Sequence, residues 1–314
     1  MMFSTEQLIE DVLKTAKGLE APCCEPVSRK VVETFSDCFA DGATVWKTTG
    51  RPHDHLYYRF FARTSTDTIS TAFDAKLLER ETTATRLIRS WSGMRGARVT
   101  QSCDFDAFNG LAKTWLYLGG MRPADEVLDR PFVPDGLRRQ LGTFRTAGLG
   151  FIRFMAVDHR HETVNLYFRA SGPIDATCCA PILDLVQVPV PEPELLADIR
   201  RFVPEDFCVA VTVSLGTGKP QRACFYALKL PPGRFPCIPE RITRFFREAP
   251  CYDADTVNVV GWSFGAEGGT YIKAEKSYTG DMVGLLTDWD CYFSGSTQRD
   301  PVLAKQAQTT SSGS

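Results

Sequence analysis

The sequence predicts an α+β protein in which ten antiparallel strands close into a barrel with helices on its outer surface. Five pairs of strand-like segments recur about every 50–58 residues, and a short loop rich in turn-forming residues joins each pair. Segments with helical periodicity separate the pairs. An open row of strands would leave unpaired edges, whereas closure removes them, so a barrel explains the repeat better than an open solenoid.

The first expected element is a helix, because Ser4 and Gln7 have the spacing of a capping box and apolar residues then recur at helical spacing as far as Ala16. Three apolar stripes predict further helices at residues 69–77, 195–202 and 238–246. The five expected hairpins are Ala43–Thr48 with Leu56–Arg63, Arg98–Asp104 with Leu111–Leu118, Gly150–Asp158 with Thr163–Ala170, Phe207–Leu215 with Gln221–Leu230, and Val257–Phe264 with Thr270–Ser277.

Composition argues against several classes of function. The 36 basic residues are balanced by 38 acidic ones, so nothing indicates binding to nucleic acid or to a membrane surface. No apolar run approaches the roughly 18–20 residues that span a bilayer. Glu6, Glu10 and Asp11 interrupt the first turns, so residues 1–18 do not form a signal peptide. We expect a cytoplasmic protein.

The cysteine pattern and the lack of linkers indicate a reduced chain with one domain. Eleven cysteines are present without any CxxC pair, so neither a zinc nor an iron–sulfur site is predicted. No low-complexity segment divides the chain. We therefore expect a single domain over residues 1–308, a monomeric state and a disordered tail at Thr309–Ser314.

Alternation along the strands places cations beside aromatic rings on one face. Lys113, Trp115 and Tyr117 share one such face, and Arg59 shares another with Phe61. A solvated face of a one-sided sheet is the simpler explanation for a single strand. Repeated over several strands, however, the pattern would expose many large aromatic rings to water. A polar, aromatic-lined barrel lumen explains it better.

Seven segments resemble the soluble aromatic prenyltransferases of the ABBA type, and most of all the 4-hydroxyphenylpyruvate dimethylallyltransferases of aminocoumarin antibiotic biosynthesis. The likeness runs in register from about Val32 to about Asp290. It implies a ten-stranded antiparallel barrel of five ααββ units with the active site in the lumen. The segments are Gly42–Thr49, Tyr58–Phe61, Ala112–Tyr117, Gly119–Ala124, Val164–Arg169, Val259–Gly265 and Lys273–Gly280.

The resemblance also implies how the donor is held. Preorganised cations and hydroxyls stabilise the charge of a departing diphosphate, and aromatic faces stabilise the allyl cation while excluding water. The matching diphosphate-binding positions are Lys47, Arg59, Lys113, Asn165, Tyr167, Arg222, Tyr226 and Lys273. Phe61 and Trp115 are candidates for the cation shield, to which Tyr167 and Tyr226 also contribute.

Positions near the aromatic acceptor follow from the same resemblance. Arg153 matches a position that could hold a carboxylate, and Glu275 matches a catalytic lumen glutamate that hydrogen-bonds a phenol. Cys208, Thr212 and Ser214 are small enough to leave room for a flat ring. Two alternatives remain open: Arg153 as a salt bridge at the barrel mouth, and Glu275 as the partner of a lumen cation.

No metal or other cofactor is expected. One branch of the family has a magnesium-binding Asp where Arg59 stands, and a guanidinium supplies fixed charge but cannot ligate a metal. A DDxxD motif is also missing. The HxH pairs His53/His55 and His159/His161 have no third ligand nearby in the sequence.

We therefore expect transfer of a dimethylallyl group from dimethylallyl diphosphate to a ring carbon of a phenol. The resemblance implies 4-hydroxyphenylpyruvate or a dihydroxynaphthalene-like acceptor, in secondary metabolism. A non-catalytic barrel that binds an aromatic metabolite is the alternative. A terpene cyclase is disfavoured by the missing acidic metal motif.

Overall fold

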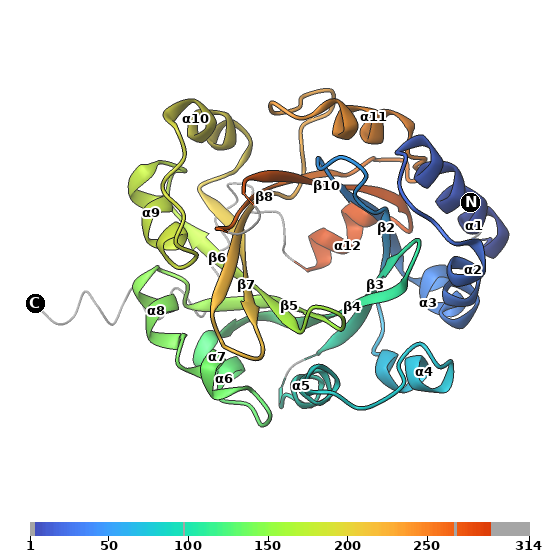
Figure 1. The fold of residues 1–314 in the computed structure, drawn as a ribbon, viewed down its shortest axis with the longest axis horizontal. Helices are drawn as coiled ribbons and strands as arrows, with labels where there is room; N and C mark the ends of the chain where they lie inside the picture. Colours follow the sequence, from blue (N-terminus) through green and yellow to red (C-terminus); the bar gives the residue numbers. More distant parts are fainter. Residues whose placement is uncertain (1–3, 97, 267–268, 290–314) are drawn as a thin grey trace, which may run out of the picture.

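The computed structural model describes residues 4–96, 98–266 and 269–289. Within them, ten antiparallel strands form one closed barrel in the order β1-β10-β9-β8-β7-β6-β5-β4-β3-β2, and helices surround it (Figure 1). This confirms the predicted fold class. The expected tail at Thr309–Ser314 lies outside the described residues.

All five expected hairpins are present. The strands are β1 (Ala43–Thr49), β2 (Tyr57–Phe61), β3 (Thr100–Asp106), β4 (Gly110–Pro123), β5 (Phe151–Asp158), β6 (Thr163–Ser171), β7 (Asp206–Ser214), β8 (Pro220–Ala227), β9 (Asn258–Phe264) and β10 (Tyr271–Thr279). Strand β4 runs five residues beyond the expected end at Leu118 because its pairing with β5 shifts register between Tyr117 and Arg122. Gly119 and Gly120 lie in that shift with φ of 70° and 137°, values that favour glycine.

The helices occupy the connections between hairpins and both ends of the chain. They are α1 (Thr5–Gly18), α2 (Glu25–Thr34), α3 (Ser36–Asp41), α4 (Thr68–Asp74), α5 (Thr83–Ser92), α6 (Ala124–Leu128), α7 (Asp135–Arg138), α8 (Leu141–Thr146), α9 (Ala176–Asp184), α10 (Pro193–Phe202), α11 (Glu240–Glu248) and α12 (Met282–Asp288). The predicted stripes correspond to α4, α10 and α11, and Ser4 caps α1 by accepting from the Gln7 N–H. Helix α12 was not anticipated.

The large hydrophobic core lies between the barrel and the outer helices. The outward faces of the strands supply side chains such as Trp46, Phe60, Phe105 and Trp262, all 0% exposed. Burial of each ring of this size contributes about 1.5–3 kcal/mol, so the outer face supplies much of the stability of the fold. The strand faces opposite those that carry the cations therefore pack against the helices.

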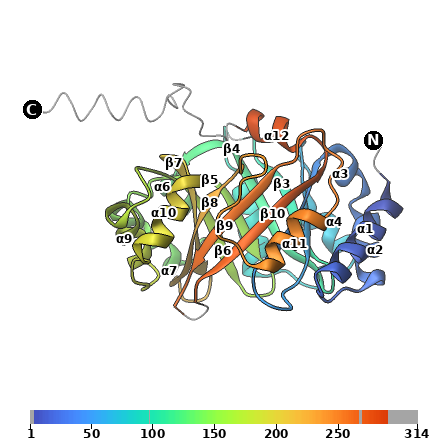
Figure 2. The same ribbon diagram turned by 90° about the horizontal axis from the view of Figure 1, so that it is seen from above.

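Helix α12 closes one end of the barrel. The five hairpin loops lie at one end, since each joins two neighbouring strands, and the helical connections lie at the other. Helix α12 follows β10 at this second end, inside the ring of strands in Figure 1 and at the edge of the barrel in Figure 2. No helix in the described part of the chain is long and apolar enough to cross a membrane.

Candidate active site

The lumen divides into a charged half and an aromatic half. The cations lie on strand positions near the hairpin end: Lys47 on β1, Arg59 on β2, Lys113 on β4, Arg222 on β8 and Lys273 on β10. Toward α12 the lumen holds a second apolar cluster, separate from the outer core, that includes Phe61, Trp115, Tyr167, Tyr226, Met282, Leu286 and Trp289. Charge and aromatic surface thus meet inside one closed barrel.

Asp104 on β3 is the acidic centre of the charged half. Its carboxylate is 0% exposed and accepts from Lys47 Nζ at 3.0 Å, from Arg59 Nη2 at 3.3 Å and from Arg59 Nε. Burial alone would raise the pKa of Asp104, but the Arg59 and Lys47 cations hold it well below its usual value. The carboxylate therefore stays ionised and fixes both cations.

Arg59 links this carboxylate to the aromatic half. Its guanidinium carbon lies 3.9 Å from the Trp115 ring centroid and 4.8 Å from that of Phe61. Its Nη2 donates to Glu275 Oε1 at 3.2 Å. Two carboxylates and two rings thus surround Arg59, so its charge is matched. It orients Glu275 and Trp115. Glu275 is thus the partner of a lumen cation, which is one of the alternatives that the sequence left open.

Lys113 pairs with Asp158, with 2.9 Å between Nζ and Oδ2. The Asp158 carboxylate also accepts from the backbone N–H groups of Arg160 and His161, both at 2.9 Å. Burial lowers the pKa of Lys113, and the ammonium groups of Lys47 and Lys273 lower it further, while Asp158 raises it. Lys113 is therefore a partly desolvated ammonium with Asp158 as its acidic partner.

Arg222 and Lys273 differ from the other three cations. Among the described residues neither forms an ion pair, and Arg222 Nε is buried without a hydrogen-bond partner. Both approach the Tyr271 ring, at 5.4 Å and 5.8 Å from its centroid. Burial would raise the pKa of Tyr271, but Lys273 and Arg222 lower it overall. These two cations are placed to receive an anion.

Asn165 on β6 adds an amide to this region. Its Oδ1 is buried without a hydrogen-bond partner, and its Nδ2 lies 3.5 Å from the Tyr167 hydroxyl. It pairs in register with Thr212 on β7, which in turn pairs with Arg222 on β8. The charged half therefore continues across three neighbouring strands.

Aromatic rings in tilted and edge-on contact form the opposite wall. The Trp115 and Tyr167 centroids are 4.7 Å apart, Phe61 meets Trp115 edge-on at 6.2 Å, and Tyr226 lies 6.0 Å from Tyr167. Burial raises the pKa of Tyr167 and of Tyr226 well above the usual tyrosine value, so both phenols stay neutral. Such a wall attracts a carbocation through its ring faces and offers it no ionised nucleophile.

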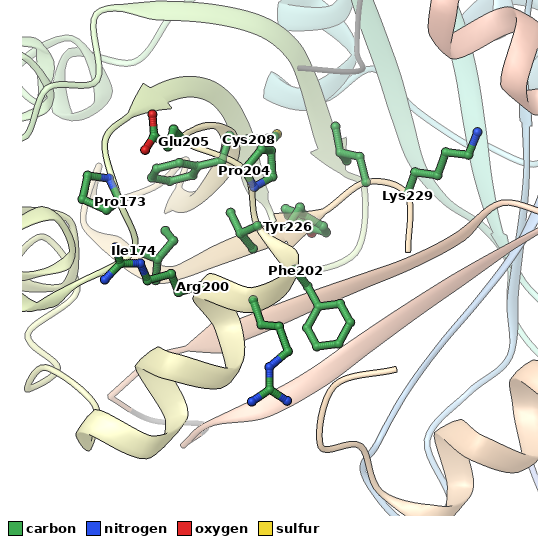
Figure 3. Close-up of a pocket in the computed structure, with 13 residues that line it drawn as sticks. Pro173, Ile174, Arg200, Phe202, Pro204, Glu205, Cys208, Tyr226 and Lys229 are labelled. Carbon is green, nitrogen blue, oxygen red and sulfur yellow. The ribbon is translucent and has the colours of Figure 1, made fainter. Parts of the chain in front are cut away.

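A cavity of about 70 Å³ lies between the two halves. Arg59 and Glu275 line it on the charged side, and Trp289 lines it with other side chains on the α12 side. A wider cleft of about 690 Å³ lies beside it, between the barrel and α10. Figure 3 shows Tyr226 and Cys208 on the barrel side of this cleft, with Arg200 and Phe202 from α10. Cys208, Tyr226 and Leu228 line both spaces, so the cleft adjoins the lumen.

The structure does not bring the expected acceptor residues together. Cys208 lines the cavity, but Thr212 lies in the charged half, and the Ser214 hydroxyl accepts from the Thr217 N–H in the β7–β8 turn. Arg153 is 5% exposed, and its Nη1 donates to the Trp289 carbonyl. Thr212 and Ser214 lie near the hairpin end of β7, away from Cys208, and their part in acceptor binding stays a prediction.

Three of the four histidines in the HxH pairs have partners in the barrel wall and its loops. His55 Nδ1 lies 2.9 Å from the Asp106 carboxylate, His159 Nε2 lies 2.9 Å from Thr114 Oγ1, and His161 Nδ1 lies 3.1 Å from Asp158. Over residues 4–96, 98–266 and 269–289, no three His, Cys, Asp or Glu side chains gather as a metal site.

Sequence analysis missed the acidic partners and the closing helix. Asp104 alternates in phase with Ser102 on β3, so strand alternation could have placed it in the lumen. The Asp281 cap followed by Met282, Leu285 and Leu286 at helical spacing could have revealed α12.

Comparison with known proteins decides the family. Residues 3–290 match the family described as "Aromatic prenyltransferase Orf2". The chain belongs to the aromatic prenyltransferase family. It is 44% identical to a 4-hydroxyphenylpyruvate 3-dimethylallyltransferase of Streptomyces niveus, over 98% of this chain and 95% of the relative. It is 37% identical to an aromatic prenyltransferase of Sclerotinia sclerotiorum, over 91% of this chain and 94% of the relative.

Solved structures of prenyltransferases share the fold. The 5-dimethylallyltryptophan synthase of Streptomyces coelicolor superposes with a TM-score of 0.60 at 9% identity, over 88% of this chain and 97% of that one. The prenyltransferase PriB, in complex with L-tryptophan and dimethylallyl thiolodiphosphate, superposes with a TM-score of 0.58 at 11% identity, over 87% and 95%. This enzyme therefore has the barrel of the ABBA prenyltransferases.

Loss of an unpaired lumen cation should slow this prenyltransferase strongly. Arg222→Ala is expected to lower kcat/KM by about 10²–10³-fold, the scale for removal of one preorganised charge-stabilising donor. Lys219→Ala, on the exposed β7–β8 turn, is the matched control and should stay near wild type. Steady-state kinetics with the prenyl diphosphate varied would check this. Wild-type rates for Arg222→Ala would show that the anion lies elsewhere.

Donor binding should weaken as the pH rises. Lys113 holds an anion only when protonated, and its pKa in the free enzyme lies below the ordinary value. A bound diphosphate raises that pKa again, so affinity is greatest below the free-enzyme pKa and falls as the pH rises through it. The KM for the donor, measured from neutral pH to about pH 10, should show this rise.

Lys113→Arg is the variant that separates Lys113 from other titrating groups. A guanidinium keeps its charge over this range, so the increase in KM should move to higher pH. An identical pH profile in both proteins would assign the titration to another group, such as the Tyr271 phenol.

Proposed function

We propose that this prenyltransferase transfers a dimethylallyl group from dimethylallyl diphosphate to a ring carbon of a phenolic acid of the 4-hydroxyphenylpyruvate type. The observation that carries the proposal is the meeting of two unpaired cations and an aromatic wall in one barrel lumen. The 44% identity to a 4-hydroxyphenylpyruvate 3-dimethylallyltransferase supports the choice of donor and acceptor. A dihydroxynaphthalene-like phenol is the alternative acceptor.

The first step is the departure of the diphosphate. The bond between the allylic carbon and oxygen breaks, and its electron pair leaves with the diphosphate. Arg222 and Lys273 stabilise the charge that accumulates, with Lys113 beside them. Because these groups are already held in place by the strands, little reorganisation accompanies the reaction.

The dimethylallyl cation forms against the aromatic wall. The faces of Trp115, Tyr167 and Tyr226 stabilise its positive charge. All three rings are 6% exposed, so little water reaches the cation before the acceptor does.

Attack by the acceptor completes the transfer. A ring carbon ortho to the phenol forms the new carbon–carbon bond, and loss of the proton from that carbon restores aromaticity. Glu275, held at 3.2 Å from Arg59 Nη2, accepts a hydrogen bond from the phenol and raises the electron density of the ring. It also orients the attacking carbon relative to the cation.

Magnesium independence is part of the proposal. Arg59 supplies fixed positive charge at the position where one branch of the family has a metal-binding Asp. The lumen carboxylates Asp104, Asp158 and Glu275 each pair with a lumen cation, which leaves them poorly available to a metal. We further propose a cytoplasmic enzyme of secondary metabolism, consistent with the lack of a disulfide among the ten described cysteines.

Incubation with dimethylallyl diphosphate and a panel of phenols tests the proposal directly. We expect a carbon-prenylated 4-hydroxyphenylpyruvate, identified by mass spectrometry and NMR, and an unchanged rate in excess EDTA. A strict requirement for magnesium would overturn metal independence. Binding of the aromatic compound without any release of diphosphate would instead indicate a non-catalytic barrel.

Glu275→Gln should slow transfer while leaving the apparent donor affinity nearly unchanged. The carboxylate assists the phenol and would repel a diphosphate, and a poorly oriented ring carbon costs about 10²-fold in such sites. Separate kcat and donor KM values check this. A variant that loses donor affinity but keeps its rate at saturation would make Glu275 a positioning residue for the lumen cations.

A further inference from the structure

Trp289 at the end of α12 fills the aromatic half of the lumen. Its ring stacks on Tyr117, with centroids 4.4 Å apart and planes inclined by 23°. Phe61 and Phe154 approach the same ring, each with a centroid distance of 5.5 Å. The side chain is 8% exposed and belongs to the apolar cluster inside the barrel. The Trp289 side chain thus occupies the space in which the aromatic rings of β2, β4 and β5 could hold a flat ligand.

The space left beside Trp289 is too small for the reaction. The cavity of about 70 Å³ must receive a five-carbon group and an aromatic ring together. A dry cavity that binds benzene alone measures about 150 Å³, and sites for larger ligands measure about 300–1,000 Å³. The wider cleft lies outside this space, between the barrel and α10, so additional volume within the aromatic half must come from a group that moves. The strand residues around the cavity are fixed by the closed barrel.

The two ends of α12 are held differently. At its start, the Asp253 carboxylate accepts from the N–H groups of Asp281 and Met282, at 2.9 Å and 3.3 Å. At its end, Trp289 is held by the ring contacts and by Arg153 Nη1, which donates to the Trp289 carbonyl. An aromatic acid can replace both contacts of Trp289. Its ring can stack as the indole does, and its carboxylate is a stronger hydrogen-bond acceptor for the Arg153 guanidinium than the backbone carbonyl is.

We propose that Trp289 occupies the subsite of the acceptor ring, is displaced when the acceptor binds, and sets the size of the rings that this enzyme accepts. The acceptor enters from the cleft that shares Cys208, Tyr226 and Leu228 with the lumen, and it stacks on Tyr117 with Phe154 beside it, as the Trp289 ring does. Its carboxylate takes the guanidinium of Arg153 from the Trp289 carbonyl. This rests on the proposed function in that the acceptor is a phenolic acid.

Fluorine NMR of protein labelled with 5-fluorotryptophan tests the displacement without turnover. The sequence has five tryptophans, and the resonance missing from Trp289→Phe identifies Trp289. Saturation with 4-hydroxyphenylpyruvate, established by calorimetry, should shift the Trp289 resonance, whereas the resonance of Trp91 in the outer core should not move. A Trp289 resonance unchanged at saturation would overturn the proposal.

The size of the subsite is tested with Trp289→Ala. For a bicyclic dihydroxynaphthalene, kcat/KM relative to 4-hydroxyphenylpyruvate should rise at least about tenfold, the lower end of the effect of small changes in pocket volume. The KM for dimethylallyl diphosphate should not change. Thr287→Ala, exposed on the same helix, is the matched control and should keep the wild-type ratio.

Two further measurements keep the outcome interpretable. If thermal unfolding shows that Trp289→Ala is not folded, Trp289→Phe replaces it, and the ratio should still rise, though less. An unchanged ratio in a folded variant would overturn the role of Trp289 while wild-type prenylation of 4-hydroxyphenylpyruvate continues. Failure of the wild-type enzyme to bind or prenylate any phenol would overturn the proposed function instead.

Discussion

The lumen depends on one buried carboxylate, that of Asp104. It fixes Lys47 and Arg59, and Arg59 in turn fixes Glu275. These four residues lie on β3, β1, β2 and β10, so the network spans the seam where the first and last strands of the barrel meet. Removal of one partner from a buried ion pair costs about 3–5 kcal/mol, because the other charge is left uncompensated. The ion pairs that stabilise the closed barrel are therefore the same ones that position the side chains of the site.

The network also explains why five cations can share one lumen. Three of them, Lys47, Arg59 and Lys113, are matched by carboxylates one or two strands away, which offsets most of their mutual repulsion. Arg222 and Lys273 remain on β8 and β10, where both approach the Tyr271 ring. The site thus concentrates its uncompensated charge at one place. A phenol approaching from the α12 end meets the aromatic wall first.

Much of the barrel was predictable from the sequence because strand alternation is a strong local signal. The faces that carry Lys113, Trp115 and Tyr167 were assigned correctly, and the hairpins were correct apart from their ends. The pairing of Arg59 with Asp104, 45 positions along the chain, depends on the register between β2 and β3 and has no local signal. Thr212 and Ser214 show a similar limit. Strand alternation predicts which face of β7 they occupy, but not how far along the barrel axis they lie, and it is this position that separates the charged half from the acceptor end. Helix α12 lies beyond the last hairpin, where the repeat offered no guide.

The molecule has two hydrophobic clusters with different tasks. The outer one, between strands and helices, contains the fully buried rings that stabilise the fold, whereas the inner one lines the reaction space. A substitution in the inner apolar cluster leaves both the outer cluster and the lumen ion pairs intact, so it affects ligand binding more than the free energy of unfolding. The architecture therefore separates the evolution of substrate choice from the maintenance of the fold. A single scaffold of this kind can diversify its chemistry by changing a few inward side chains, with little need for compensating changes elsewhere.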